Sequence, residues 1–72
     1  LRVNFLPMTL TFTKPCGFRL AIDAAKIVSV DDMGDFCVID TDTATYEVQE
    51  SFEDIVSAIN TLKMQHVMKF YN

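Results

Sequence analysis

Residues 44–59 read ATYEVQESFEDIVSAI, and the spacing of the apolar residues changes within this stretch. In its first five residues apolar and polar side chains alternate, which is typical of a β-strand with one buried face. From Ser51 onward the apolar residues recur at intervals of three and four, which is typical of an amphipathic helix. Asp54 follows Ser51 by three residues, in a variant of the capping box. The stretch therefore predicts a strand over 44–48 and a helix over 51–72.

The chain before this stretch carries four further strand patterns. Pro15 and Gly17 predict a tight turn after the first pattern, and Asp23 is placed to cap a single helical turn after the second. The last of the four is a continuous apolar run, which indicates a central strand covered on both faces. The four patterns cover 8–14, 18–22, 27–30 and 36–39.

These elements predict an α+β fold, a small antiparallel β-meander of about five strands followed by one long C-terminal α-helix. A chain of 72 residues forms one domain. Within it residues 1–7 are either derived from an expression vector or a true N-terminal extension, because the strand pattern begins at Met8. We expect one core, made of Leu10, Phe12, Leu20, Ile22, Val38, Phe52, Ile55, Val56 and Ile59.

The composition excludes several classes of protein. Half of the residues are hydrophobic, which is too many for a disordered acidic chain, yet no apolar run approaches the roughly 20 residues of a membrane span. The net charge is −4 and the pI about 4.6, which argues against direct binding of nucleic acid. With no secretion signal visible and only two cysteines, we expect a cytoplasmic protein with free thiols.

One set of short motifs points to a family. The motifs are Leu10-Thr11-Phe12-Thr13, Gly17, Leu20-Ala21-Ile22-Asp23, Ile27-Val28-Ser29-Val30, Val48-Gln49-Glu50-Ser51 and Ile55-Val56 with Ile59. This pattern resembles the FlbD family, short bacterial and phage-type chains associated with flagellar gene clusters. The resemblance covers about residues 9–60 and implies this fold and a non-enzymatic role as an accessory protein.

The residue types of catalysis and metal binding are present without the patterns that these functions need. His66 is the single histidine, and Ser51 has a structural role as the helix cap, so the sequence gives no sign of a Ser-His pair. The acids of residues 40–42 lack the twelve-residue loop of a calcium site. Cys16 and Cys37 with one histidine do not make a zinc site. We therefore predict no catalytic residues, no cofactor and no bound metal.

The acidic residues are concentrated in one part of the chain. All ten lie within 23–54, where Lys26 is the single base, so this segment carries a net charge of −9. Alternate turns of a meander lie at the same end, so the acids should divide between two ends. One end should hold Asp31, Asp32, Asp35, Glu50, Glu53 and Asp54, and the other Asp40 and Asp42. This acidic cluster is either a solvated face or a surface that attracts a basic partner.

The end of the predicted helix carries a second apolar stripe, formed by Met64, Met68 and Tyr71. A helix over 51–72 is about 33 Å long, whereas a five-residue strand covers about 17 Å. Its distal part must therefore contact the N-terminal segment, a second subunit of a homodimer or a target protein. Methionine side chains adapt well to such partners.

Together these features predict a small non-enzymatic module for protein–protein interaction, which binds a partner through its C-terminal helix and its acidic face. The alternative is an acidic inhibitor encoded by a phage or mobile element. Such an inhibitor would block a host nucleic-acid enzyme, RNA polymerase or a nuclease, by occupying the place of a phosphate backbone.

Overall fold

The computed structural model describes the backbone of residues 8–71 and the side chains of residues 8–62. Five antiparallel strands precede one helix, so the predicted α+β fold is confirmed. The elements are β1 (Thr9–Thr13), β2 (Arg19–Asp23), the 3-10 helix η2 (Ala24–Lys26), β3 (Ile27–Asp32), β4 (Cys37–Thr41), β5 (Thr45–Val48) and α1 (Phe52–Tyr71).

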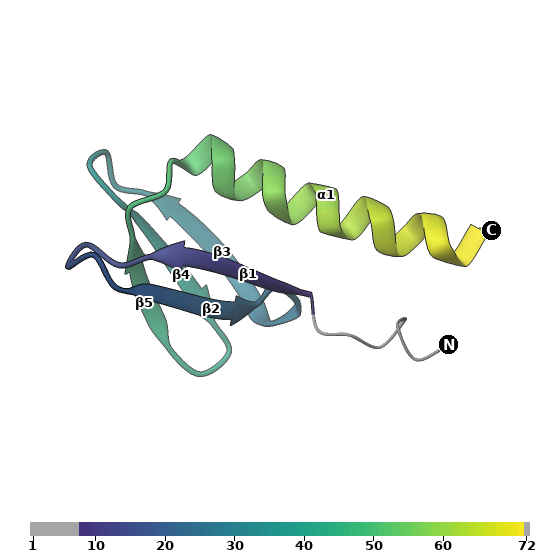
Figure 1. The fold of residues 1–72 in the computed structure, drawn as a ribbon, viewed down its shortest axis with the longest axis horizontal. Helices are drawn as coiled ribbons and strands as arrows, with labels where there is room; N and C mark the ends of the chain where they lie inside the picture. Colours follow the sequence, from purple (N-terminus) through teal and green to yellow (C-terminus); the bar gives the residue numbers. More distant parts are fainter. Residues whose placement is uncertain (1–7, 72) are drawn as a thin grey trace.

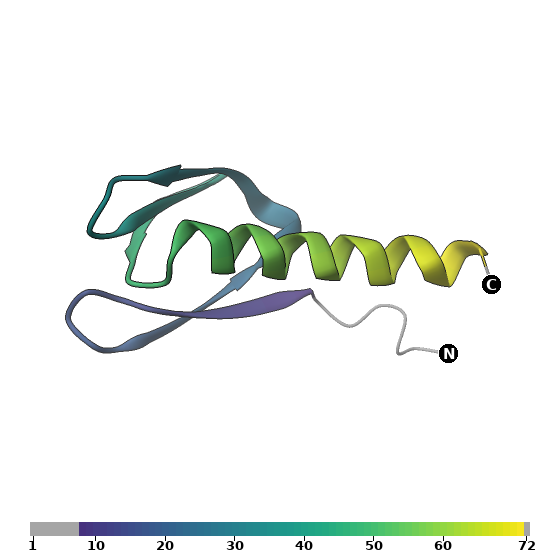
Figure 2. The same ribbon diagram turned by 90° about the horizontal axis from the view of Figure 1, so that it is seen from above.

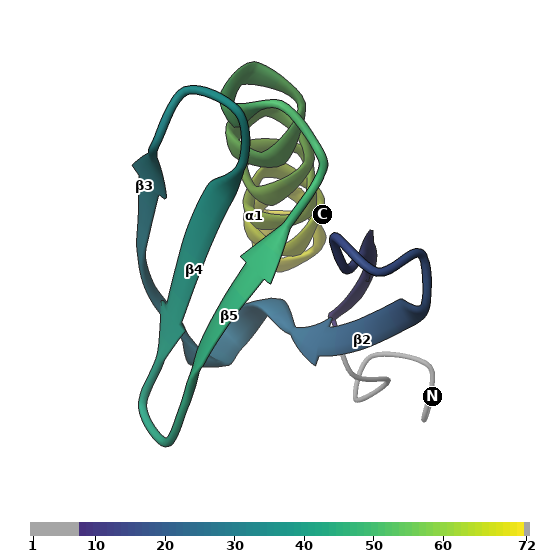
Figure 3. The same cartoon turned by 90° about the vertical axis from the view of Figure 1, so that its left-hand side faces the viewer.

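The strands divide between two sheets. β1 and β2 form a hairpin, and β3, β4 and β5 form a three-stranded sheet with β4 at its centre. The helix η2 separates the two sheets: Asp23 caps it by accepting a hydrogen bond from the Ala25 N–H at 3.0 Å, as the sequence predicts. The N–H of Ala24 donates to the Met8 carbonyl at 2.6 Å. This turn redirects the chain, so that the hairpin and the sheet lie on either side of α1 (Figure 3).

A single apolar core lies where the two sheets and the helix meet. Three of the nine predicted core residues, Phe12, Ile22 and Ile55, are buried in it. Four others are half-buried and pack against it, namely Leu10, Leu20, Phe52 and Ile59. The remaining buried members come from the three-stranded sheet, namely Cys37, Ile39 and Val48. The helix therefore joins two sheets that would each be too small to bury a core alone.

The expectation that the strand over 36–39 is covered on both faces is wrong. Side chains alternate along β4, so Cys37 and Ile39 face the core and Val38 faces the other side, where it is half-buried. Val56, also expected in the core, is half-buried and lies outside the core cluster.

The outer face of the three-stranded sheet is polar. Asp40, which the sequence places in a turn, lies in β4 and accepts hydrogen bonds from both neighbouring strands. Ser29 Oγ donates to it at 2.8 Å and Thr45 Oγ1 at 2.9 Å. One carboxylate thus ties three strands together on the face that the core leaves uncovered.

The helix extends beyond the strands. α1 has 20 residues and a length of about 30 Å at about 1.5 Å per residue. Its first turns cover the core, and its distal half continues past the ends of the described strands (Figures 1 and 2). The overhang expected from the sequence is therefore present in the fold.

Candidate functional site

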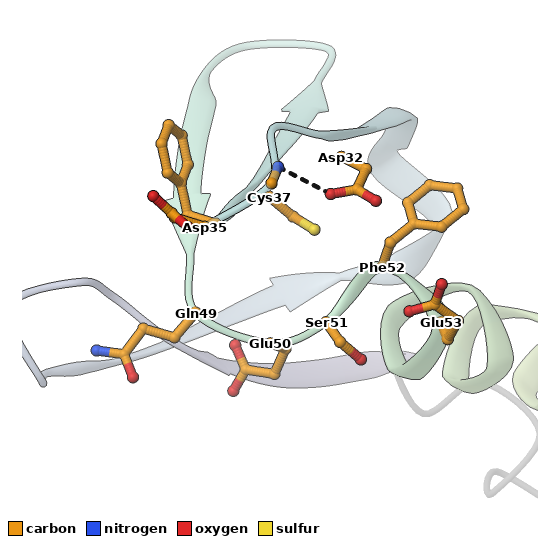
Figure 4. A pocket seen from close by; sticks show the side chains of 10 residues that line it. Asp32, Asp35, Cys37, Gln49, Glu50, Ser51, Phe52 and Glu53 are labelled. Atoms are coloured by element: carbon orange, nitrogen blue, oxygen red, sulfur yellow. Dashed lines mark hydrogen bonds between the residues drawn. The ribbon is translucent and has the colours of Figure 1, made fainter.

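The turn between β3 and β4 and the connection from β5 to α1 enclose a polar hollow of about 200 Å³ at one end of the molecule (Figure 4). Four carboxylates line it, together with apolar and small residues, and no lysine, arginine or histidine does. We call this site the acidic hollow. Its lining residues are Asp32, Gly34, Asp35, Phe36, Cys37, Gln49, Glu50, Ser51, Phe52 and Glu53.

The β3–β4 turn forms the first wall of the acidic hollow, and hydrogen bonds within the turn fix its shape. Asp32 Oδ1 accepts a hydrogen bond from the N–H of Gly34 at 3.0 Å, and the N–H of Met33 donates to the carbonyl of Phe36 at 2.9 Å. Gly34 has φ of +98°, a left-handed conformation that glycine adopts without strain. This turn presents Asp35 to solvent, where its side chain is exposed.

The second wall is fastened to the β1–β2 hairpin. Glu50 accepts two hydrogen bonds from Thr13, from the N–H to Oε1 and from Oγ1 to Oε2, both at 2.9 Å. The N–H of Gln49 donates to the carbonyl of Thr13 at 2.8 Å, and its side-chain Nε2 donates to the carbonyls of Lys14 at 2.9 Å and Pro15 at 3.2 Å. These bonds hold the two sheets together at this end.

The helix begins at the edge of the hollow. Ser51 Oγ accepts a hydrogen bond from the N–H of Asp54 at 3.1 Å, which confirms the predicted cap. Glu53 lies in the first turn of α1, where a negative charge interacts favourably with the helix dipole. The start of the helix therefore adds the exposed carboxylate of Glu53 to the lining of the hollow, at a position where its negative charge is favourable.

The structure brings together four of the six acids expected at this end, namely Asp32, Asp35, Glu50 and Glu53. Asp31 and Asp54 are exposed but do not line the hollow. Glu50 accepts hydrogen bonds from Thr13 and Asp32 accepts one from Gly34, so Asp35 and Glu53 are the exposed lining acids that accept no hydrogen bond from another described residue. Asp42 lies in the β4–β5 turn, and Asp40 in β4 is engaged with Ser29 and Thr45.

The other three residues predicted to bind a partner are on the distal helix. The helix includes their positions, but the side chains of Met64, Met68 and Tyr71 lie outside the described residues.

The sequence assigns no role at the site to two of its residues. Gln49 belongs to the resemblance motif Val48-Gln49-Glu50-Ser51, and only its hydrogen bonds to the hairpin show what it does in the fold. Cys37 lies at the bottom of the hollow with its thiol directed into it (Figure 4). Burial, and then the negative charges of Asp32 and Glu53, raise the pKa of this thiol above its ordinary value. Cys37 is thus a neutral, protonated thiol, which is a poor nucleophile.

The chemistry of the hollow suits electrostatic contact. Among the described residues no three His, Cys, Asp or Glu side chains are placed to hold a metal ion. The volume is below the roughly 300–1,000 Å³ of pockets that enclose small ligands. The hollow therefore offers carboxylates that can form electrostatic contacts with cationic groups.

The comparisons with known proteins give no relatives. No family model matches the chain, and no curated protein or solved structure matches it either. The resemblance to the FlbD family therefore stays a prediction. No helix within the described residues combines the length and the apolar character needed to cross a membrane.

Proposed function

We propose that this protein is a non-enzymatic interaction module that binds a basic partner protein through the acidic hollow. The observation that carries the proposal is the concentration of carboxylates on one end face, from two segments far apart in the sequence, with no cation among the lining residues. Such a surface attracts a positively charged partner over a Debye length, about 10 Å at 0.1 M salt, and speeds its association.

The distal part of α1 supplies a second contact in this proposal. Its sequence is apolar on several sides, and the described strands do not accompany it (Figure 1). A partner held first by charge could then bury the helix surface that includes Met64, Met68 and Tyr71. The electrostatic contact would set the rate of association, and the apolar contact the lifetime of the complex.

Affinity capture from a lysate of the source organism tests the acidic contact. The parent chain is compared with a variant carrying Asp35→Lys and Glu53→Lys, and with a control carrying Asp42→Lys and Glu47→Lys. All four acids are exposed, and both variants change the net charge equally, but the control leaves the hollow intact.

The expected result is a partner that the parent and the control retain and the hollow variant loses. The partner should elute as salt rises from about 0.1 M to about 1 M, since the Debye length falls from about 10 Å to about 3 Å. Equal capture by all three chains contradicts the proposal. Circular dichroism of each variant excludes loss of folding as the cause.

A narrower form of the proposal is an inhibitor of a nucleic-acid enzyme, such as RNA polymerase or a nuclease, encoded by a phage or mobile element. The support is that clustered carboxylates without cations present the same charge as a phosphate backbone. Double-stranded DNA should then displace the captured partner. If DNA leaves the complex intact, the partner binds at a surface other than its nucleic-acid channel, and the inhibitor form is wrong.

A further inference from the structure

The turn of the β1–β2 hairpin presents an unusual surface beside the acidic hollow. We call residues 14–19 the hairpin tip. Phe18 is 73% exposed, the largest exposed fraction among the large hydrophobic side chains described. The exposed cations Lys14 and Arg19 flank it. The tip therefore combines an aromatic side chain with two positive charges in a protein whose net charge is −4.

The hairpin tip is held rigidly. The N–H of Lys14 donates to the carbonyl of Phe18 at 2.7 Å, and the N–H of Gly17 donates to the carbonyl of Lys14 at 2.8 Å. Gly17 has φ of +99°, which closes the turn. Gln49 binds the carbonyls of Lys14 and Pro15 from outside the turn. An aromatic side chain on a backbone fixed in this way loses less conformational entropy on binding than one on a mobile loop.

The tip and the hollow are adjacent on the same end face. Gln49 lines the hollow and at the same time bonds to the tip. Figure 3 views this end of the molecule and shows the β3–β4 turn, the start of α1 and the β1–β2 turn together on it. A basic aromatic projection thus lies next to an acidic depression that contains Phe36 and Phe52 in its lining.

We propose that this end face is self-complementary and that two copies of the chain associate through it about a twofold axis. The inference rests on the proposed function in one respect: both take the acidic hollow as a binding surface for basic groups, and here a second copy of the chain supplies those groups. In a twofold dimer each surface meets the partner's counterpart. Two neighbouring patches of opposite charge satisfy that condition, since the tip of each copy meets the hollow of the other. Phe18 then leaves water as Lys14 and Arg19 approach Asp35 and Glu53.

The dimensions of the molecule predict a weak dimer. Its principal extents are 40 × 20 × 20 Å, so the end face offers roughly 400 Å² from each copy. A standard stable interface takes roughly 800 Å² from each partner. We therefore expect a dimer that is detectable only at concentrations approaching millimolar and that weakens with salt. A basic partner that occupies the hollow should compete with dimerisation.

Charge exchange between two variants tests this arrangement by sedimentation velocity. The tip variant carries Lys14→Glu and Arg19→Glu, and the hollow variant carries Asp35→Lys and Glu53→Lys. Each alone should dimerise at least about tenfold more weakly than the parent, because like charges would face each other. An equimolar mixture should recover the association as a heterodimer with the charges exchanged. Phe18→Ser should also weaken the parent dimer, without any change of charge.

The control variant with Asp42→Lys and Glu47→Lys has the same net charge as the hollow variant and should dimerise at least as well as the parent. A parent that stays monomeric up to millimolar concentration overturns the inference. So does a dimer that persists in the tip variant and at about 1 M salt, which indicates an apolar interface such as the distal helix. The tip variant keeps the hollow intact, so its capture of a basic partner reports on the proposed function separately.

Discussion

Glu50→Ala removes the carboxylate that holds the β1–β2 hairpin against the start of α1. In the parent this carboxylate accepts two hydrogen bonds of 2.9 Å from Thr13, one from the backbone N–H and one from Oγ1. Both residues are half-buried, so the bonds are partly shielded from water. The substitution leaves the N–H of Thr13 without its partner at the junction of the two sheets.

The expected loss of stability follows from these bonds. A hydrogen bond to a charged group contributes about 1.5–3 kcal/mol, with the lower values at half-exposed sites such as this one. Two such bonds, each at the lower end of that range, predict a loss of about 3 kcal/mol on Glu50→Ala. In a domain of this size each kcal/mol corresponds to a Tm shift of about 4–8 °C, so Tm should fall by about 12–24 °C.

Thermal and urea unfolding followed by circular dichroism measures this effect. Glu47→Ala is the matched control, because it removes the same charge from an exposed side chain on β5, and it should change stability by no more than about 0.5 kcal/mol. Thr13→Val removes only the Oγ1 bond, and in a double-mutant cycle it should couple to Glu50→Ala by about 1 kcal/mol. If the Glu50 and Glu47 variants melt together, this contact does not join the sheets and the reasoning is wrong.

Three further predictions concern the core and the thiols. Ile55, which is 1% exposed, should lose about 2–5 kcal/mol on change to Ala and about 0.5–1.5 kcal/mol on change to Val, measured by urea unfolding; equal midpoints for both variants would show that α1 packs through another face. A thiol reagent should modify exposed Cys16 rapidly and buried Cys37 only after unfolding. Burial, with Asp32 and Glu53, raises the folded pKa of Cys37 above its ordinary value of 9.0. The contribution of this thiol to stability is therefore complete below pH 9 and is lost as pH rises through the folded pKa. The difference in unfolding free energy between the parent and Cys37→Ser should shrink over that pH range, and a constant difference would contradict this prediction.

The acidic hollow was predictable in part, and the limit of the prediction has a physical reason. Alternation of turns in a meander places the acids of the β3–β4 turn at the same end as the helix start, and Asp32, Asp35 and Glu53 do line one hollow. Charge pattern cannot show which carboxylates are already engaged. Glu50 binds Thr13 and Asp40 binds Ser29 and Thr45, through contacts between residues 5 to 37 positions apart.

The sequence by itself determines the elements, because their signals are local. The change of apolar spacing within residues 44–59 marks the end of the strands and the start of the helix. Ser51 caps the helix, and Gly17 and Gly34 close turns at positive φ. Each of these features depends on residues a few positions apart in the sequence. They can therefore be predicted without knowledge of the tertiary structure.

Only the tertiary structure decides which face of the uniformly apolar strand β4 is buried and how the two sheets meet. A run of four apolar residues is compatible with either face, and burial of Ile39 against Ile55 puts Cys37 inward and Val38 outward. The resemblance motif Val48-Gln49-Glu50-Ser51 shows the same division: its strand and cap roles are local, whereas the bonds of Gln49 and Glu50 to the hairpin exist only after folding. In a uniformly apolar run successive side chains alternate between two equally apolar faces, and the two faces differ only once distant segments pack against one of them.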